Sequence, residues 1–166
     1  AKSRGIHLLN LVRRDEAVQE LIDLGVENVL STSDADWQQK AREMMGKAGA
    51  TSAIDSVGGD VSADLVELLG LDGELIVFGT ATGAPMPLSS GSLIMKHITV
   101  KGFWGSRVSS EMDPDERKRL ITELVTLTAT GKLALEDGGV FSIDQISAAL
   151  KAALTPGRTG KVMISG

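Results

Sequence analysis

Two adjacent arginines, Arg13 and Arg14, follow the apolar run IHLLNLV in a chain whose formal net charge is −5. Asp15 comes directly after them, so the doubled positive charge stands where a strand-like run ends. Guanidinium groups stay charged near neutral pH, and their fork of N–H donors matches the oxygens of a phosphate group. The pair therefore indicates an anion-binding site. The alternative is a solvated start of the following helix, which the helix dipole disfavours for basic residues.

Glycine-rich segments follow three further strand-like runs, at residues 57–59, 79–83 and 102–106. Glycine lets a backbone approach a ligand closely, and ligands of doubly wound sheets bind across the carboxyl ends of the strands. Each segment alone can be an ordinary turn after a strand. The set of three, together with the arginine pair, favours a bound dinucleotide.

The arginines also indicate which dinucleotide. At the tip of the second strand of a dinucleotide fold, an acidic residue binds the 2′-hydroxyl of NAD, whereas arginine accommodates the 2′-phosphate of NADP. Arg13 and Arg14 occupy that tip if the residues before Gly5 are the end of the first helix of the fold. The sequence therefore predicts NADPH as the cofactor.

No residue of the chain is predicted to be catalytic, and no metal site is predicted. The chain contains no cysteine and no tyrosine, and its two histidines, His7 and His97, are read as packing or edge residues. Asp55 follows an apolar run and is read as a structural residue at a strand end. The G-x-S-x-G, phosphate-loop and H-E-x-x-H motifs are absent from the sequence.

Strand-like and helical patterns alternate along the chain. Strands are expected at residues 6–12, 28–31, 52–59, 73–79, 97–103 and 161–165, and helices at 16–24, 33–45, 61–69, from Asp113 to 131, and after Ser142. A loop is expected at residues 80–92. This alternation is typical of βαβ units. The predicted fold class is α/β, with a Rossmann-like doubly wound parallel sheet.

The composition limits the remaining function classes. With 166 residues, 42% of them apolar and 23% charged, the chain is expected to form one globular domain. Its acidic balance argues against nucleic acid or an anionic membrane surface as the main partner. No apolar run approaches the length of a membrane helix. A cytoplasmic location is expected, because the chain lacks cysteine.

Five segments carry a resemblance to a known family: NLVRRDE, DSVGGD, VFGTATGAP, SLIMKHITVKGFWGSR and GRTGKVMI. In this order they resemble the C-terminal part of the zinc-independent medium-chain dehydrogenases/reductases. The resemblance is strongest to the mitochondrial-type trans-2-enoyl thioester reductases and covers essentially the whole chain. Quinone oxidoreductases are the neighbouring group. Residues 1–166 are thus expected to be a partial NADPH-binding domain with the C-terminal tail of such a reductase.

The resemblance implies roles for individual residues. Arg13, Arg14 and Asp15 would surround the 2′-phosphate, although Asp15 stands where the family often has a further basic residue. The remaining expected contacts with cofactor or substrate are Val57, Phe78, Gly79, Thr80, Ala81, Phe103, Trp104, Gly105, Ser106 and Lys161. Gly105 replaces a bulkier apolar residue of the family, which implies an altered acyl pocket. Phe103 and Trp104 have an alternative reading as a core pair at the sheet edge.

The resemblance also implies that parts of the family's fold are missing. The first strand of the Rossmann sheet, its glycine-rich loop and the N-terminal domain with the proton-donating tyrosine have no counterpart here. The chain alone is therefore expected to be inactive. A homodimer is expected through the strand edge from His97 to Phe103, and the substrate is expected to be an enoyl thioester. A quinone-reducing enzyme and a non-enzymatic dimerising module are the alternatives.

Overall fold

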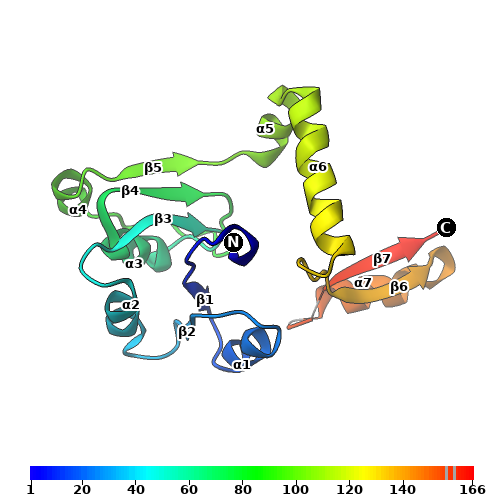
Figure 1. Ribbon diagram of the computed structural model, residues 1–166. Coiled ribbons are helices and arrows are strands. Elements are labelled where there is room, and N and C mark those ends of the chain that lie inside the picture. Colours follow the sequence, from blue (N-terminus) through cyan, green and yellow to red (C-terminus); the bar gives the residue numbers. More distant parts are fainter. Residues whose placement is uncertain (156, 159) are drawn as a thin grey trace. The chain divides into compact units, whose positions relative to one another are not determined.

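The chain folds into two compact units, Ala1–Glu111 and Met112–Gly166. The computed structural model describes residues 1–155, 157–158 and 160–166 (Figure 1). Thr159, which belongs to the segment GRTGKVMI, lies outside the described residues. Each unit is described by itself.

The first unit alternates strands and helices, as predicted. Its elements are η1 Lys2–Arg4, β1 Asn10–Val12, α1 Glu16–Asp23, β2 Val29–Ser31, α2 Trp37–Met45, β3 Ala50–Asp55, α3 Asp60–Leu68, β4 Leu69–Val77, α4 Ser90–Met95, β5 Thr99–Gly102 and α5 Gly105–Glu111.

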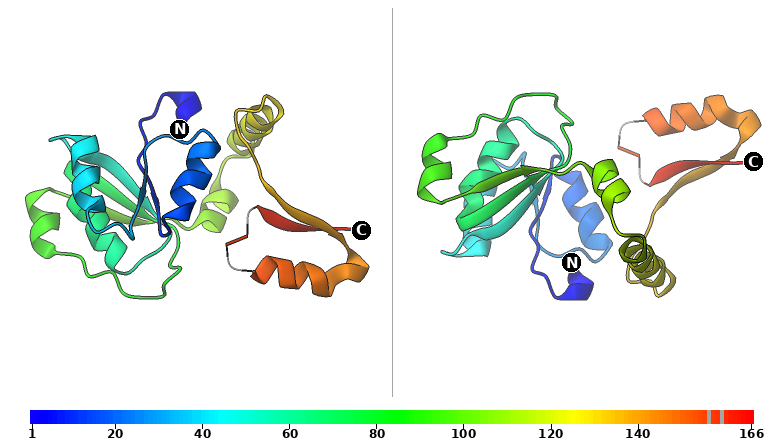
Figure 2. Two further views of the ribbon diagram at one scale, coloured as in Figure 1. Left: turned by 90° about the horizontal axis from the view of Figure 1, so that it is seen from below. Right: turned by 90° about the horizontal axis from the view of Figure 1, so that it is seen from above.

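Two separate groups of parallel strands form the first unit. β1 pairs with β2, and β4 pairs with β3 on one side and β5 on the other. Among the described residues, no ladder of hydrogen bonds joins the two groups. Figure 2 shows β1 pointing toward the same side of the unit as β3, β4 and β5, and Figure 1 shows it set apart from them. The α/β class with parallel strands is therefore confirmed, as is a sheet divided into two flanks.

Two buried clusters hold the first unit together. In one, Trp37 and Ala41 of α2 pack with Leu68 of α3 and contact the half-buried Leu11 and Leu30 of the β1–β2 pair. Helix α2 thus joins the strand group that carries the arginines to the rest of the unit. The second cluster, Val66, Leu69 and Leu75, packs α3 and β4 together with partly buried residues of β3 and α4.

The second unit is a βαβ arrangement preceded by a long helix. It contains α6 Pro114–Ala129, β6 Asp137–Ser142, η2 Ile143–Gln145, α7 Ile146–Leu154 and β7 Lys161–Ser165, with β6 and β7 parallel. Asp113 caps α6 as predicted, because its carboxylate accepts hydrogen bonds from the backbone N–H groups of Asp115 (3.0 Å) and Glu116 (3.1 Å). Gln145 Oε1 accepts from the N–H of Ser142 at 3.2 Å, as expected of a capping box.

The structure corrects four expectations. β4 begins at Leu69, where a helix was predicted to end, because Leu69 pairs with Ala50 of β3 and is buried. The pairing of β3 with β4 then shifts register before Ser52. Helix α4 begins inside the predicted loop, capped by Ser89, whose hydroxyl accepts from the N–H of Ser92 at 3.2 Å. Helix α5 and strand β6 were not predicted.

Candidate functional site

The turn after β3 is organised by one carboxylate. Asp55 Oδ1 accepts hydrogen bonds from the backbone N–H of Val57 at 2.7 Å and of Gly58 at 3.2 Å. Asp55 Oδ2 accepts from the hydroxyl of Ser62 on α3 at 2.6 Å. Asp55 is 2% exposed and Ser62 is 0% exposed. Both carboxylate oxygens are thus occupied, in agreement with the structural role predicted for Asp55.

This turn is held against the turn that follows β4. Ala81 donates its N–H to the carbonyl of Ser56 at 3.2 Å, and Thr82 donates both its N–H and its hydroxyl to the carbonyl of Val57, each at 3.0 Å. Three hydrogen bonds therefore join two of the glycine-rich segments into one surface. The structure brings together the predicted residues Val57, Thr80 and Ala81.

Glycine is required where the two turns meet. A Cβ on Gly79 would lie 2.8 Å from the carbonyl oxygen of Ser56, which is closer than real Cβ contacts. Gly58 and Gly59 have φ values of +75° and +69°, a region that residues with a side chain rarely adopt. Glycine at these positions therefore lets the backbones of the two turns come close together at the carboxyl ends of β3 and β4.

Three aromatic residues follow the carboxyl ends of β4 and β5. Phe78 and Phe103 directly follow the neighbouring strands β4 and β5, with the N–H of Phe78 bonded to the carbonyl of Asp55 (2.9 Å) and that of Phe103 to Val77 (2.8 Å). Phe78, Phe103 and Trp104 are 54%, 47% and 68% exposed. Phe103 and Trp104 therefore do not form a core pair within the described chain. Such exposed rings can stack on a planar ligand.

Gly105 and Ser106 begin helix α5 rather than a simple turn. Ser106 lines a shallow hollow of about 530 Å³ together with Trp104, Arg107 and Ser110. Lys161 is the first residue of β7 in the second unit. Its expected approach to the cofactor stays a prediction, because the two units are not placed relative to one another.

The arginine pair occupies the tip of β1, as predicted. The carbonyl of Arg13 accepts a hydrogen bond from the hydroxyl of Ser33 at 2.5 Å, and Thr32 donates its N–H to Val12 at 2.7 Å. The loops after β1 and β2 are thereby tied together. Arg14 Nη2 lies 3.8 Å from Glu20 Oε2 on α1. Asp15 directly precedes α1, and its exposed side chain makes no capping hydrogen bond.

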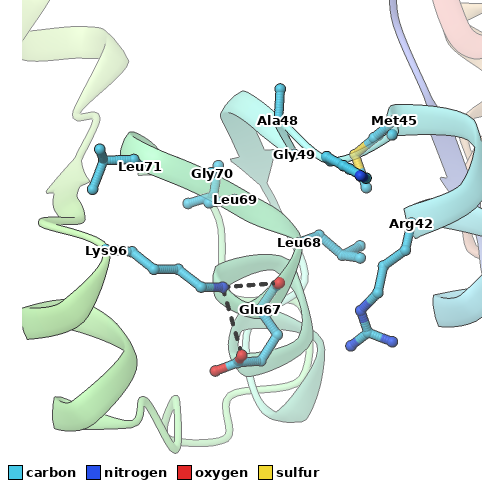
Figure 3. A pocket seen from close by; sticks show the side chains of 12 residues that line it. Arg42, Met45, Ala48, Gly49, Glu67, Leu68, Leu69, Gly70, Leu71 and Lys96 are labelled. Atoms are coloured by element: carbon cyan, nitrogen blue, oxygen red, sulfur yellow. Dashed lines mark hydrogen bonds and ion pairs between the residues drawn. The ribbon is translucent and has the colours of Figure 1, made fainter.

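A second pocket, of about 480 Å³, lies at the amino ends of β3 and β4 (Figure 3). Lys96 reaches into it and donates from Nζ to the carbonyls of Val66 (3.2 Å) and Glu67 (3.0 Å), so it caps the end of α3. The hydroxyl of Ser92, and then the charge of Lys96, lower the pKa of the Glu67 carboxyl. Arg42 lies on the other side of the pocket. This pocket is at the opposite ends of the strands from the glycine turns.

β5 offers an open strand edge. In the part of the chain that the structure describes, it pairs with β4 alone, and all four of its residues are exposed. His97, just before β5, has a φ of +54°, and its Nδ1 lies 2.7 Å from Oδ1 of Asp72, so it is an exposed edge residue as predicted. The dimer expected through this edge stays a prediction.

A family model described as zinc-binding dehydrogenase matches residues 1–124. The chain belongs to this family. Among curated relatives, human mitochondrial enoyl-[acyl-carrier-protein] reductase is 26% identical over 169 residues, which cover 99% of this chain and 45% of the relative. Quinone oxidoreductase-like protein 2 of Rattus norvegicus is 26% identical over 151 residues, with 91% and 43% covered. The predicted medium-chain dehydrogenase/reductase resemblance is confirmed, and the chain spans less than half the length of these relatives.

Solved structures share the fold. A quinone oxidoreductase of Pseudomonas syringae pv. Tomato DC3000 matches with a TM-score of 0.78 at 20% identity, covering all (100%) of this chain and 51% of that chain. A mutant enoyl thioester reductase of Candida tropicalis matches with a TM-score of 0.77 at 19% identity, covering 95% and 46%. These likenesses confirm the Rossmann-like arrangement of the parallel strands.

The family description refers to zinc, but the donor set of this chain does not fit a zinc site. Structural and catalytic zinc ions are held by cysteine, histidine and carboxylate ligands. The chain has no cysteine, and its described residues contain no group of three or more His, Asp or Glu side chains able to hold a metal. No zinc chemistry is therefore assigned to it.

Among the described helices, none has the length and apolar character needed to cross a membrane.

Three residues of the site escaped prediction: Ser62, Thr82 and Glu20. Ser62 and Thr82 orient the turns through hydrogen bonds to Asp55 and Val57, and Glu20 approaches Arg14. Ser62 could have been predicted as a partner of Asp55, because it places a hydroxyl group in the first turn of the helix that follows Asp55. Thr82 had no comparable signal, because its partner lies 25 positions away in the chain.

Proposed function

We propose that the protein is an NADPH-dependent oxidoreductase that reduces the double bond of trans-2-enoyl thioesters carried by coenzyme A or acyl carrier protein. One observation carries the proposal: the exposed arginine pair directly follows β1 and the joined glycine turns follow β3 and β4, and these strands point toward the same side of the first unit in Figure 2. Ligands of doubly wound sheets bind at that edge. The enoyl reductases among the relatives support the reaction class.

The described residues fit a nicotinamide dinucleotide in their chemistry. Arg13 and Arg14 supply guanidinium groups for the 2′-phosphate. The backbone from Phe78 to Ala81, made accessible by Gly79, supplies polar groups for the ribose and pyrophosphate. Phe103 and Trp104, which follow β5, supply exposed ring surface. When bound, NADPH supplies the hydride, and the role proposed for this chain is to hold and orient it.

Cofactor titration of the full-length protein tests the phosphate assignment. Charge-assisted hydrogen bonds contribute about 1.5–3 kcal/mol each, and each 1.4 kcal/mol is a tenfold change in Kd. Arg13→Ala and Arg14→Ala should therefore each weaken NADPH binding roughly tenfold or more while changing the Kd of NADH by less than about twofold. Arg42→Ala, at the other end of the strands, is the control with the same charge change. Equal affinities for NADPH and NADH, unchanged by both substitutions, would contradict the proposal.

The substrate requires a separate experiment. A short trans-2-enoyl-CoA should be reduced with a higher kcat/KM than a quinone. A quinone reductase is the second candidate function, because the rat quinone oxidoreductase-like protein is as similar to this chain, at 26% identity, as the human enoyl reductase. Preference for the quinone would select it. Binding of neither nucleotide would instead favour a non-enzymatic dimerising module.

Two further expectations belong to this proposal. Residues 1–166 alone should show no turnover, because the chain contains no tyrosine to donate the proton that the family resemblance implies. The full-length protein should be a homodimer that pairs the open edges of β5, which would extend the parallel groups into one sheet across two subunits. Light scattering of wild type and Val100→Pro, a change that blocks edge pairing, tests the dimer. A cytoplasmic location also stays a prediction.

A further inference from the structure

Acidic side chains surround the arginine pair. Asp15 and Glu16 follow it in the sequence, and Glu20 lies one helical turn further along α1. Only Glu20 comes within ion-pair distance of an arginine of the pair among the described residues, at 3.8 Å from Arg14 Nη2. The site that would receive a phosphate thus already contains a carboxylate for one of its two cations.

We infer that Glu20 is the resident counter-ion of Arg14, that the 2′-phosphate of NADPH displaces it, and that Glu20 thereby limits the preference for NADPH over NADH. This inference rests on the proposed function. It assigns the two arginines different roles. Arg13 is the cation available to the phosphate at all times, and Arg14 becomes available only after it leaves Glu20.

The geometry supports an exchangeable pair. The Arg14 and Glu20 side chains are 53% and 57% exposed, so water and ligands reach both. Their separation of 3.8 Å is longer than a hydrogen bond, and phosphate oxygens form closer, two-pronged contacts with a guanidinium. The backbone of Arg14 is fixed, because its carbonyl accepts the N–H of Ala17 at 3.2 Å in the first turn of α1. Exchange therefore requires only rotation of side chains.

Arg13 differs from Arg14 in its surroundings. Its backbone is held, because its carbonyl accepts a hydrogen bond from the hydroxyl of Ser33 at 2.5 Å. Within the described residues, no carboxylate lies within ion-pair distance of its guanidinium. A phosphate bound at Arg13 would bring its negative charge toward the Glu20 carboxylate. Repulsion between charges closer than the Debye length, about 8 Å at physiological salt, is only partly screened. Glu20 opposes NADPH in two ways: it holds Arg14 and it repels the phosphate.

Removing the charge of Glu20 should tighten NADPH binding. Exposed ion pairs of this kind change equilibrium constants by up to about fivefold. We expect Glu20→Gln to lower the Kd of NADPH two- to fivefold and to leave the Kd of NADH within about 1.5-fold, since NADH carries no 2′-phosphate. The gain should shrink as the salt concentration rises, because the effect is electrostatic.

The decisive experiment is a double-mutant cycle in the full-length protein, measured by NADPH and NADH titration. The four proteins are wild type, Glu20→Gln, Arg14→Ala and the double variant. If Glu20 acts through Arg14, most of the gain from Glu20→Gln disappears in the Arg14→Ala background. Glu16→Gln is the matched control, because it removes the same charge from the same helix without breaking an ion pair. It should give a smaller gain that Arg14→Ala does not abolish.

The outcomes separate this inference from the proposed function. If Arg13→Ala and Arg14→Ala leave NADPH binding unchanged, the proposed function itself fails. If they weaken it but Glu20→Gln has the same effect on NADPH with and without Arg14, the counter-ion role is wrong. Weaker NADPH binding by Glu20→Gln would also overturn it, because the pair would then position Arg14 for the phosphate. An unchanged NADH Kd shows that each variant is folded.

Discussion

Replacing Asp55 by alanine should destabilise the first unit more than any other single change at the glycine turns. The carboxylate accepts three hydrogen bonds, and two of the donors, Gly58 N–H and the Ser62 hydroxyl, are buried. Leaving a buried donor unsatisfied costs about 1–3 kcal/mol. Val57 is only half-buried, so water can replace the carboxylate there. The expected loss in the free energy of unfolding is therefore about 3–5 kcal/mol.

Two conservative variants divide this loss. In Asp55→Asn, the carboxamide oxygen still accepts from the turn, and its NH₂ group can donate to the Ser62 hydroxyl, so about 1–2 kcal/mol is expected. Ser62→Ala removes one donor and leaves Asp55 Oδ2 without a partner, again at about 1–2 kcal/mol. Asp60→Ala, an exposed change in the first turn of α3, is the control. It should lower the free energy of unfolding by about 0.5 kcal/mol, the size of a helix-dipole effect.

Urea unfolding of the full-length protein measures these effects. Trp37 is buried in the cluster that joins α2 and α3, so its fluorescence reports on unfolding of the first unit. The same variants should weaken NADPH and NADH binding in parallel, because the joined turns move when the network is lost. A free energy of unfolding for Asp55→Ala within about 1 kcal/mol of wild type would refute the reasoning.

Two further changes test neighbouring features. Gly79→Ala should lower the thermal midpoint and weaken dinucleotide binding, because its Cβ would lie 2.8 Å from the Ser56 carbonyl; Gly102→Ala, with no atom within 4 Å, should do neither, and similar effects of both would exclude the steric cause. Burial, and then the charge of Asp60, raise the pKa of Asp64, so the folded state favours the protonated acid and stability falls as pH rises through that pKa. Asp64→Asn keeps an acceptor for Gln38 and should therefore add about 0.5 kcal/mol to the free energy of unfolding at pH 7 and less at pH 3.5. An equal gain at both pH values in thermal unfolding would show that the ionisation of Asp64 is not its cause.

The elements that could be predicted from sequence are those with local signals. The helix start at Asp113 is one, since its cap, Pro114 and Glu116 are contiguous in sequence and their hydrogen bonds form within one turn. Helix α5 and strand β6 were missed for the opposite reason. α5 is short and mostly polar and β6 contains a glycine pair, so neither shows the apolar periodicity of a core element.

The same distinction applies to the candidate site. The arginine pair, the glycine turns and Asp55 are recognisable because the residue type alone restricts the chemistry or the backbone conformation. Thr82 is not recognisable in this way, because its hydroxyl contacts a carbonyl 25 residues earlier, and only the pairing of β3 with β4 brings the two together. The Arg14–Glu20 contact likewise depends on how the strand tip turns into α1.

Different interactions support the two parts of the candidate site, the joined turns and the arginine tip. The joined turns depend on Asp55, whereas the arginine tip depends on the hydrogen bonds that Ser33 and Thr32 make to the loop after β1. Among the described strands, no ladder connects the two groups. Changes at Asp55 should therefore weaken NADPH and NADH alike, while changes at Arg13 or Glu20 should alter only their ratio. General affinity and cofactor choice would then be separable by mutation.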